Sequence, residues 1–221
     1  MRKHVGQNHI NWISDFPSNW KIKRYKQIFE ERDEKSEKGD ETLLSVSALT
    51  GITPRSEIID EGGFISTAKS LTGYKKCYPK DLVMNIMLAW NKGLAISKYE
   101  GIVSPAYAVF KIKSNDNPDF LNYLIRDEQT NLYFKSYSKG IIDSRLRLYS
   151  NIFLQLYCVL PDLETQKKIV EFLNKKTSKI QNLLNKYNQL IELYNDRINT
   201  LVLDEIKNPK TQYIRLQHAC H

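Results

Sequence analysis

The sequence predicts an α+β protein in which a mixed-sheet domain is followed by one long α-helix. Two observations carry this prediction. Up to Pro161, apolar and β-branched runs alternate with segments rich in Gly, Pro and Asn, which is typical of short strands and loops. From Leu163 to Ile206 the chain has no Gly and no Pro in 44 residues, and its apolar residues repeat every seven. We therefore expect a domain over residues 1–161, a helix over 162–207 and a disordered tail over 208–221.

Within the domain, apolar runs predict four strands, at Leu43–Leu49, Asp81–Met87, Ala106–Ile112 and Phe153–Leu160. Asn117 before Pro118 is the pattern of a helix N-cap with proline in the first turn, and the apolar residues after it predict a helix to about Tyr137, which Gly140 ends. Asn11–Trp20 gathers three aromatic residues around one proline and predicts an anchored turn. The charged stretch Glu30–Glu41 predicts a solvated loop or a helix end.

The long helix carries an apolar seam over more than four heptads. Its a positions are Val170, Thr177, Leu184, Ile191 and Ile198, and its d positions are Leu173, Ile180, Tyr187, Tyr194 and Leu201. At about 1.5 Å per residue the helix would be roughly 66 Å long. A helix of that length cannot bury its seam on one compact domain, so it needs a partner helix of similar length. Two shorter helices, broken near Asn182 or Asn195, are the alternative.

The composition favours a folded protein with a polyanionic partner. The 221 residues are 41% hydrophobic and 26% charged, which fits one large domain or a domain with an appendage. The net charge of +8 favours nucleic acid or a membrane surface without choosing between them. No apolar run approaches the roughly 18 residues of a transmembrane helix, and no signal peptide is recognisable. The three scattered cysteines fit a reducing cytoplasm.

The patterns of the common catalytic sites are absent. All four histidines, His4, His9, His218 and His221, lie near the chain ends, which weakens a histidine-based metal site or triad. We find no P-loop, no dinucleotide-binding glycine pattern, no nucleophile elbow and no zinc-protease motif. The sequence therefore favours a binding role over catalysis, with no metal or nucleotide cofactor.

Positive charge is concentrated in two segments of the domain. Lys69–Lys92 holds five lysines and one aspartate, and Lys135–Arg147 holds four basic residues and one aspartate. Arginine and asparagine side chains suit base edges, whereas lysine and serine suit phosphates. The candidate DNA contacts are Lys69, Trp90, Asn91, Lys92, Ser138, Lys139, Arg145 and Arg147.

Three features of these segments allow more than one interpretation. Gly93 and Gly140 are expected to let the backbone approach DNA closely. Alternatively, the segments form an ordinary solvated basic surface and Trp90 belongs to the core. One arginine, more readily Arg147 than Arg145, can pair with Asp143 and only shape its loop.

Four segments carry a family resemblance. Asn11–Phe29 has a Trp, a Pro and a second Trp before a basic amphipathic stretch, and Val159–Ile180 has a proline, an acidic residue and a Gln at the start of the long helix. Together with Ser70–Phe110 and Gly140–Tyr149, these segments resemble the specificity subunit of type I restriction–modification enzymes. The resemblance covers nearly all of residues 11–206.

The resemblance implies a target-recognition domain that reads one half of a split sequence in double-stranded DNA, followed by a spacer helix that pairs as an antiparallel coiled coil. It also implies two methyltransferase subunits docked on this frame, restriction subunits that complete the enzyme, and no chemistry in the specificity subunit itself. The chain holds one such unit where family members typically hold two. A natural half-subunit would pair with a second copy, whereas a truncated or interrupted long subunit is the alternative. A symmetric pair would read a palindromic split site.

Two other functions remain in competition with this one. The first is a coiled-coil adaptor without sequence-specific DNA binding, against which the clustered charge of the domain argues. The second is a stand-alone DNA-modifying enzyme, which would need a cofactor or metal site that the sequence does not show.

Overall fold

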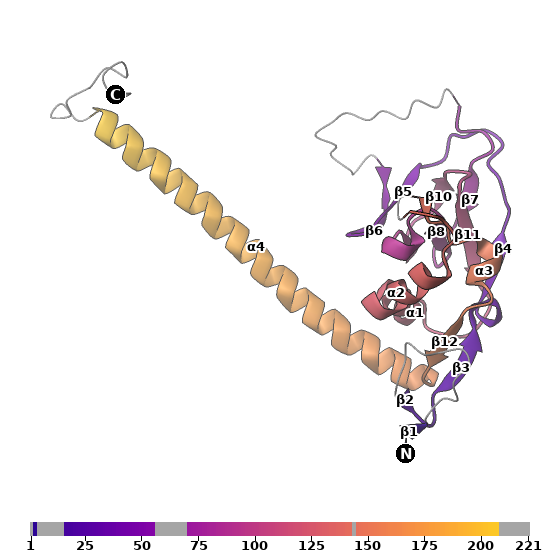
Figure 1. Cartoon of the computed structure of the whole chain (residues 1–221). Coiled ribbons are helices and arrows are strands. Elements are labelled where there is room, and N and C mark those ends of the chain that lie inside the picture. Colours follow the sequence, from indigo (N-terminus) through magenta and orange to yellow (C-terminus); the bar gives the residue numbers. More distant parts are fainter. Residues whose placement is uncertain (1, 4–15, 56–69, 143–144, 208–221) are drawn as a thin grey trace. The chain divides into compact units, whose positions relative to one another are not determined.

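A computed structural model describes residues 2–3, 16–55, 70–142 and 145–207 (Figure 1). By their internal contacts the residues form two compact units, Met1–Val170 and Glu171–His221. The first unit holds all the described strands, and the second holds most of the long helix. The tail predicted over 208–221, and the first half of the turn predicted at Asn11–Trp20, lie outside the described residues.

The centre of the first unit is a four-stranded antiparallel sheet with the order β4-β11-β8-β9. Its strands are β4 (Phe29–Arg32), β11 (Tyr107–Ile112), β8 (Leu82–Asn85) and β9 (Leu94–Ile96). Four antiparallel pairs surround it: β10 (Gly101–Val103) with β7 (Lys75–Cys77), β5 (Leu44–Ser47) with β6 (Gly51–Pro54), β12 (Tyr157–Leu160) with β3 (Lys21–Arg24), and β1 (Arg2–Lys3) with β2 (Phe16–Pro17). An isolated parallel bridge joins Leu43 to Ile102, so the predicted α+β class with mixed sheet structure is confirmed.

The helix predicted over Pro118–Tyr137 is two helices, α1 (Pro118–Arg126) and α2 (Glu128–Tyr137). The predicted N-cap is confirmed, because the side chain of Asn117 accepts a hydrogen bond from the amide of Phe120 at 3.0 Å. The prediction of one continuous helix was wrong, because Asp127 has an extended backbone with ψ of 147° and ends α1. Its carboxylate accepts hydrogen bonds from the amides of Gln129 and Thr130 and begins a second helix.

The charged stretch Glu30–Glu41 begins as strand β4 and was wrongly predicted to be a loop or helix end throughout. β4 is an edge strand with one face in solvent, so charged side chains are tolerated on it. Glu30 pairs across the strands with Lys111 at 3.1 Å, and Arg32 bonds Asp81 with 2.9 Å between Nε and Oδ2. Cross-strand ion pairs therefore replace the apolar alternation that usually marks a strand.

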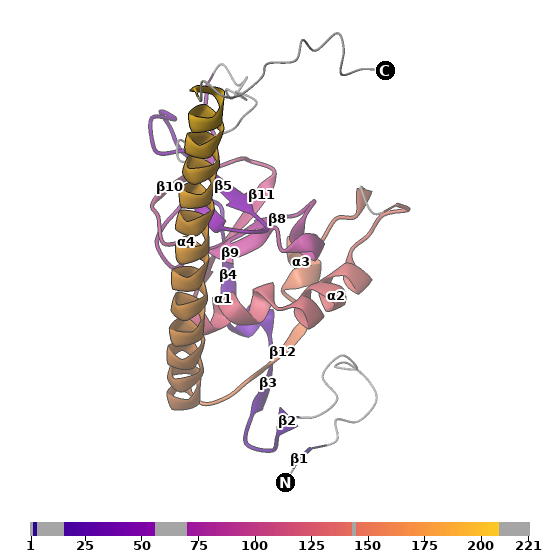
Figure 2. The same ribbon diagram turned by 90° about the vertical axis from the view of Figure 1, so that its left-hand side faces the viewer.

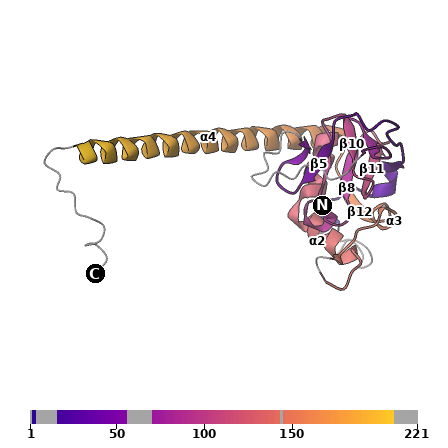
Figure 3. The same cartoon turned by 90° about the horizontal axis from the view of Figure 1, so that it is seen from above.

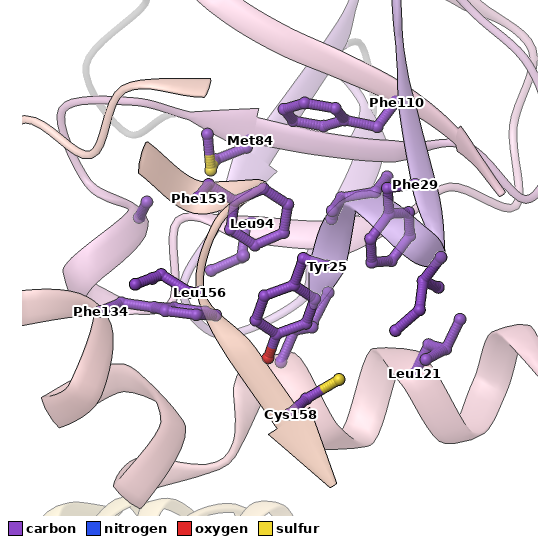
Figure 4. Packing of buried hydrophobic residues seen from close by; sticks show 14 of the residues in the cluster. Tyr25, Phe29, Met84, Leu94, Phe110, Leu121, Phe134, Phe153, Leu156 and Cys158 are labelled. Carbon is purple, nitrogen blue, oxygen red and sulfur yellow. The ribbon is translucent and has the colours of Figure 1, made fainter. Parts of the chain in front are cut away.

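The predicted strand Phe153–Leu160 is half right. Ser150–Phe153 forms the short helix α3, and the strand β12 begins only at Tyr157. Phe153 turns into the main core, where its ring lies 4.7 Å from that of Tyr25, 5.3 Å from Phe110 and 5.7 Å from Phe134 (Figure 4). Packing of one aromatic side chain thus overrides the local strand preference.

The first residues of the long helix α4 (Leu163–Lys207) belong to the first unit, in which Gln166 and Val170 are buried. The Gln166 side chain accepts from the Asn117 amide at 2.8 Å and donates to the Asp116 carboxylate and the Pro161 carbonyl. Asp162 accepts from the Thr165 amide at 2.9 Å, as an N-cap does. The proline, the acidic residue and the glutamine therefore each have a structural role at this junction.

Helix α4 is uninterrupted over its 45 residues, so the single long helix is confirmed and the break near Asn182 or Asn195 is not found. Every seam residue from Ile180 to Leu201 is at least half exposed in the single chain. No helix in the described parts of the chain has the length and apolarity needed to span a bilayer.

Candidate nucleic-acid interface

Helix α2 joins the two basic segments on one side of the first unit. The first is the β8–β9 loop, Ile86–Gly93, and the second is the 138–149 hairpin between α2 and α3. The amide of Leu148 donates to the carbonyl of Ile86 at 2.9 Å, and the ammonium of Lys135 on α2 lies 5.0 Å from the centre of the Trp90 ring. Figures 2 and 3 show the hairpin standing out from the domain beside α2. The structure thus brings together segments that lie about fifty residues apart in the sequence.

The β8–β9 loop is built around the short 3-10 helix η3 (Ala89–Asn91). The Trp90 side chain donates its Nε1–H to the carbonyl of Met87 at 3.0 Å, so this donor is used within the loop. Trp90 is half-buried and belongs to none of the core clusters of the described residues, so its predicted alternative place in the core is not found. Asn91 is exposed and Lys92 is half-buried.

Lys92 has a left-handed backbone, with φ of 58°, which a non-glycine residue adopts only when its surroundings hold it there. Its amide donates to the Asn131 side chain on α2 at 2.9 Å, and its carbonyl accepts from Arg126 on α1 at 3.1 Å. Helices α1 and α2 therefore hold the backbone where η3 ends. This fixes the direction in which the side chains of Asn91 and Lys92 extend from the loop.

Arg126 connects the β8–β9 loop with the β5–β6 turn through five backbone carbonyls. These carbonyls belong to Ser47, Ala48 and Leu49 in the turn and to Lys92 and Leu94 after η3, at donor–acceptor distances from 2.6 to 3.4 Å. Burial lowers the pKa of Arg126, because the guanidinium has lost water. Arg126 therefore positions the two loops relative to each other.

The 138–149 hairpin has a fixed base. Lys139 and Arg147 exchange two backbone hydrogen bonds of 2.9 Å, and Leu146 and Leu148 are buried. The Ser138 hydroxyl donates to the Phe134 carbonyl at 2.8 Å, which ends α2. Lys139 and Arg145 are exposed, whereas Arg147 is half-buried and donates to the Leu146 carbonyl at 2.9 Å.

The eight predicted contacts therefore fall into three groups. Asn91, Lys139 and Arg145 present exposed side chains, and Trp90, Lys92, Ser138 and Arg147 are partly buried within the two segments. Lys69 lies outside the described residues, as does Asp143, the alternative partner of Arg147. Lys135 and Arg126 were missed. Lys135 follows Asn131 by one helical turn, which could have placed both on the loop side of α2, but nothing local marks Arg126, whose partners lie 32 to 79 residues away.

Both glycines are required by the chain's own packing, and their expected role in a close approach to DNA stays a prediction. A Cβ at Gly93 would lie 2.6 Å from the Leu88 Cβ and 2.7 Å from the Leu88 carbonyl oxygen. A Cβ at Gly140 would lie 2.5 Å from the Arg145 carbonyl oxygen. Glycine at these positions lets each loop close on itself, which is a sufficient reason for its presence without any DNA.

We expect Gly93→Ala to destabilise the domain by about 1–3 kcal/mol, because the added methyl group overlaps both backbone and side chain of Leu88. Urea denaturation followed by circular dichroism would measure this loss. An unchanged unfolding midpoint would mean that the β8–β9 loop can move away from Leu88 without cost.

Within the described residues, no group of three or more His, Cys, Asp or Glu side chains is arranged to hold a metal ion. Cys77 and Cys158 are buried, and burial raises the pKa of the Cys77 thiol to about 12 and that of Cys158 further. Thiols with such pKa values are poor nucleophiles and poor metal ligands at neutral pH.

The structure therefore defines a class of protein in which an α+β domain with two neighbouring basic loops is followed by a long helix whose heptad seam is exposed. The model of the family described as the type I restriction modification DNA specificity domain matches residues 17–193. The chain belongs to this family.

Three solved structures share the fold. The HsdS subunit from Thermoanaerobacter tengcongensis aligns with a TM-score of 0.57 and 15% identity, over 89% of this chain and 52% of that one. A chain from a study of complex assembly in the type I R-M system aligns with 0.56 and 16%, over 92% and 48%. The type I S subunit from M. genitalium aligns with 0.53 and 10%, over 85% and 47%. The chain thus spans about half the length of these subunits. No curated protein sequence matches it.

Proposed function

We propose that this chain is the non-catalytic specificity subunit of a type I restriction–modification system and that its first unit binds one half of a bipartite DNA target. The observation that carries the proposal is the pair of basic loops on one side of the domain. In sequence these loops, Ile86–Gly93 and 138–149, hold Lys92, Lys139, Arg145 and Arg147 against a single carboxylate, Asp143. Such a surface suits phosphates and base edges together.

We further propose that two copies pair through α4 as an antiparallel coiled coil. The seam from Ile180 to Leu201 is at least half exposed in one copy, and a second copy offers the same seam with matching length. The resulting dimer would present two identical domains related by a two-fold axis and read a palindromic split site.

The same helix carries apolar side chains beyond the a and d positions. Phe172, Leu183, Leu190 and Leu193 are about half exposed or more, and a two-stranded coiled coil covers them at most in part. This second stripe supports a further helical partner, and we assign it to the methyltransferase subunits, with restriction subunits joining the complete enzyme.

An electrophoretic mobility shift with the methyltransferase subunits and this chain tests the proposal. A duplex is first selected from a random library by binding to this complex. The expected result is a shifted complex on the selected duplex that persists in an excess of random-sequence competitor. Assembly with the methyltransferase but no DNA shift would indicate an adaptor. Modification or cleavage of DNA by the chain alone would indicate an enzyme.

Two substitutions should separate base contacts from phosphate contacts. Arg145→Ala should weaken binding to the selected duplex by about 1–3 kcal/mol and broaden sequence preference, whereas Lys139→Ala should weaken all duplexes alike and reduce the salt slope by about one. Titration of selected and random duplexes at two salt concentrations measures both effects.

Lys21→Ala is the matched control for lost charge, because Lys21 is exposed on β3, away from the hairpin (Figure 2). It should change neither affinity nor salt slope beyond the effect of net charge. If Arg145→Ala and Lys139→Ala behave like this control, the DNA-binding surface lies elsewhere on the domain.

A further inference from the structure

The 138–149 hairpin carries two aliphatic side chains that the domain does not use for packing. Ile141 is 96% exposed and Ile142 is 55% exposed. Both follow Gly140 directly in the sequence and lie within the hairpin. A single exposed isoleucine is unremarkable in a folded protein, so the surroundings of Ile141 decide whether it has a role.

The hairpin holds Ile141 on a fixed base. The two backbone hydrogen bonds between Lys139 and Arg147 close the base, and the Arg145 amide donates to the Ile142 carbonyl at 2.8 Å. Leu148 is fully buried in the main core cluster and anchors the outgoing strand. Because Ile is β-branched, its side chain is also stiff at χ1. A side chain with few rotamers loses little conformational entropy when it is inserted into a partner.

The charges beside Ile141 favour DNA as the partner. Exposed Lys139 lies two residues before it and exposed Arg145 four residues after it. In sequence the hairpin also holds Arg147 and a single carboxylate, Asp143, so its net charge is positive. An apolar groove on a protein would have to accept these cations together with the isoleucine. A duplex instead offers phosphates and base edges for the cations and the apolar faces of stacked bases for the isoleucine, as in proteins that insert apolar wedges between base steps.

We propose that Ile141 is a wedge that enters the base stack of the recognised half-site while Lys139 holds a flanking phosphate and Arg145 contacts a neighbouring base edge. The inference rests on the proposed DNA-recognition function and adds a means of indirect readout to it. Partial unstacking costs least at pyrimidine–purine steps, so the half-site should contain such a step where the hairpin lies. Part of the specificity would then come from the deformability of the DNA.

The test uses the assembled methyltransferase with the full-length chain and a selected duplex. One adenine per duplex, moved step by step along the half-site, is replaced by a fluorescent analogue whose emission rises on unstacking. The wild-type complex should raise the emission at one step besides the adenine that the methyltransferase itself flips out of the stack. Ile141→Ala should abolish this rise and weaken binding to the selected duplex by about tenfold, with random-duplex affinity and salt slope unchanged. Ile141→Leu should retain most of both effects.

Ile22→Ala is the matched control, because Ile22 is an exposed isoleucine on β3, away from the hairpin. It should leave emission and affinity unchanged. If the wild type binds the selected duplex without that rise in emission, or Ile141→Ala binds it as tightly as the wild type, the wedge is wrong while DNA recognition stands. Loss of methyltransferase assembly in Ile141→Ala would place Ile141 against protein and also overturn the wedge. A wild type that binds no duplex at all would overturn the proposed function itself.

Discussion

Replacing Leu184 and Ile191 by aspartate should convert the chain from a dimer into a monomer. Both residues occupy a positions in the centre of the seam and are at least half exposed in the single chain. In a two-stranded coiled coil their side chains would face the partner, so two aspartates per helix would bury four carboxylates without counter-charges. Each buried, unpaired charge costs several kcal/mol, which exceeds what the rest of the seam can offset.

Sedimentation velocity at tens of micromolar would measure the change in mass. The matched control is Asn182→Asp with Gln189→Asp, which adds the same charge on the outer f positions and should leave the dimer intact. Thermal melting of the first unit should be the same in both variants, because both pairs belong to the second unit. A wild-type chain that sediments as a monomer would contradict the homodimer and leave only an assembly that depends on the methyltransferase.

Arg126→Met should cost about 3–5 kcal/mol of folding free energy, which is large for one residue outside the aromatic core. Methionine is similar in length but cannot donate, so the carbonyls that the guanidinium now satisfies lose a charged donor. The β5–β6 turn and the β8–β9 loop would then no longer be held together, and Asn91 and Lys92 would lose their fixed direction.

Urea denaturation gives the free energy of unfolding, and hydrogen exchange of the amides of Leu49 and Lys92 reports on the two loops separately. Arg24→Met is the control, because Arg24 donates to the Gln155 side chain at the surface and stacks on Tyr157, so its loss should cost about 1 kcal/mol or less. A loss below about 1 kcal/mol in Arg126→Met would mean that water can replace the guanidinium at the carbonyls.

The long helix could be predicted from the sequence because its determinants are local. The absence of breakers between Leu163 and Ile206 and the seven-residue repeat act on every turn, and no tertiary contact has to be known. The strands β8 and β11 are recognisable for a similar reason, since both faces of the central sheet bury their side chains and leave an apolar run. The N-cap at Asn117 is likewise a short-range hydrogen bond.

The candidate site was predictable only in part. Clustered charge in the sequence locates the segments around Trp90 and Arg145, because a cation has the same charge wherever the chain places it. The distance between these segments in space is not a local property. The two segments lie close together because the Leu148 amide donates a hydrogen bond to the Ile86 carbonyl and the Lys135 ammonium lies over the Trp90 ring.

By itself the sequence determined the long helix with its seam, the central strands and the two basic segments, since each depends on residues within a few turns of one another. Only the tertiary structure decided the break at Asp127, the charged edge strand β4, the clamp of Arg126 on two loops and the use of Gly93 for packing. These features arise where a backbone carbonyl, a carboxylate or a neighbouring strand from a distant part of the chain supplies the partner. A local pattern cannot contain that partner. The sequence alone therefore predicted a continuous helix through Asp127 and a charged loop in place of β4, and it did not mark Arg126 or the packing role of Gly93.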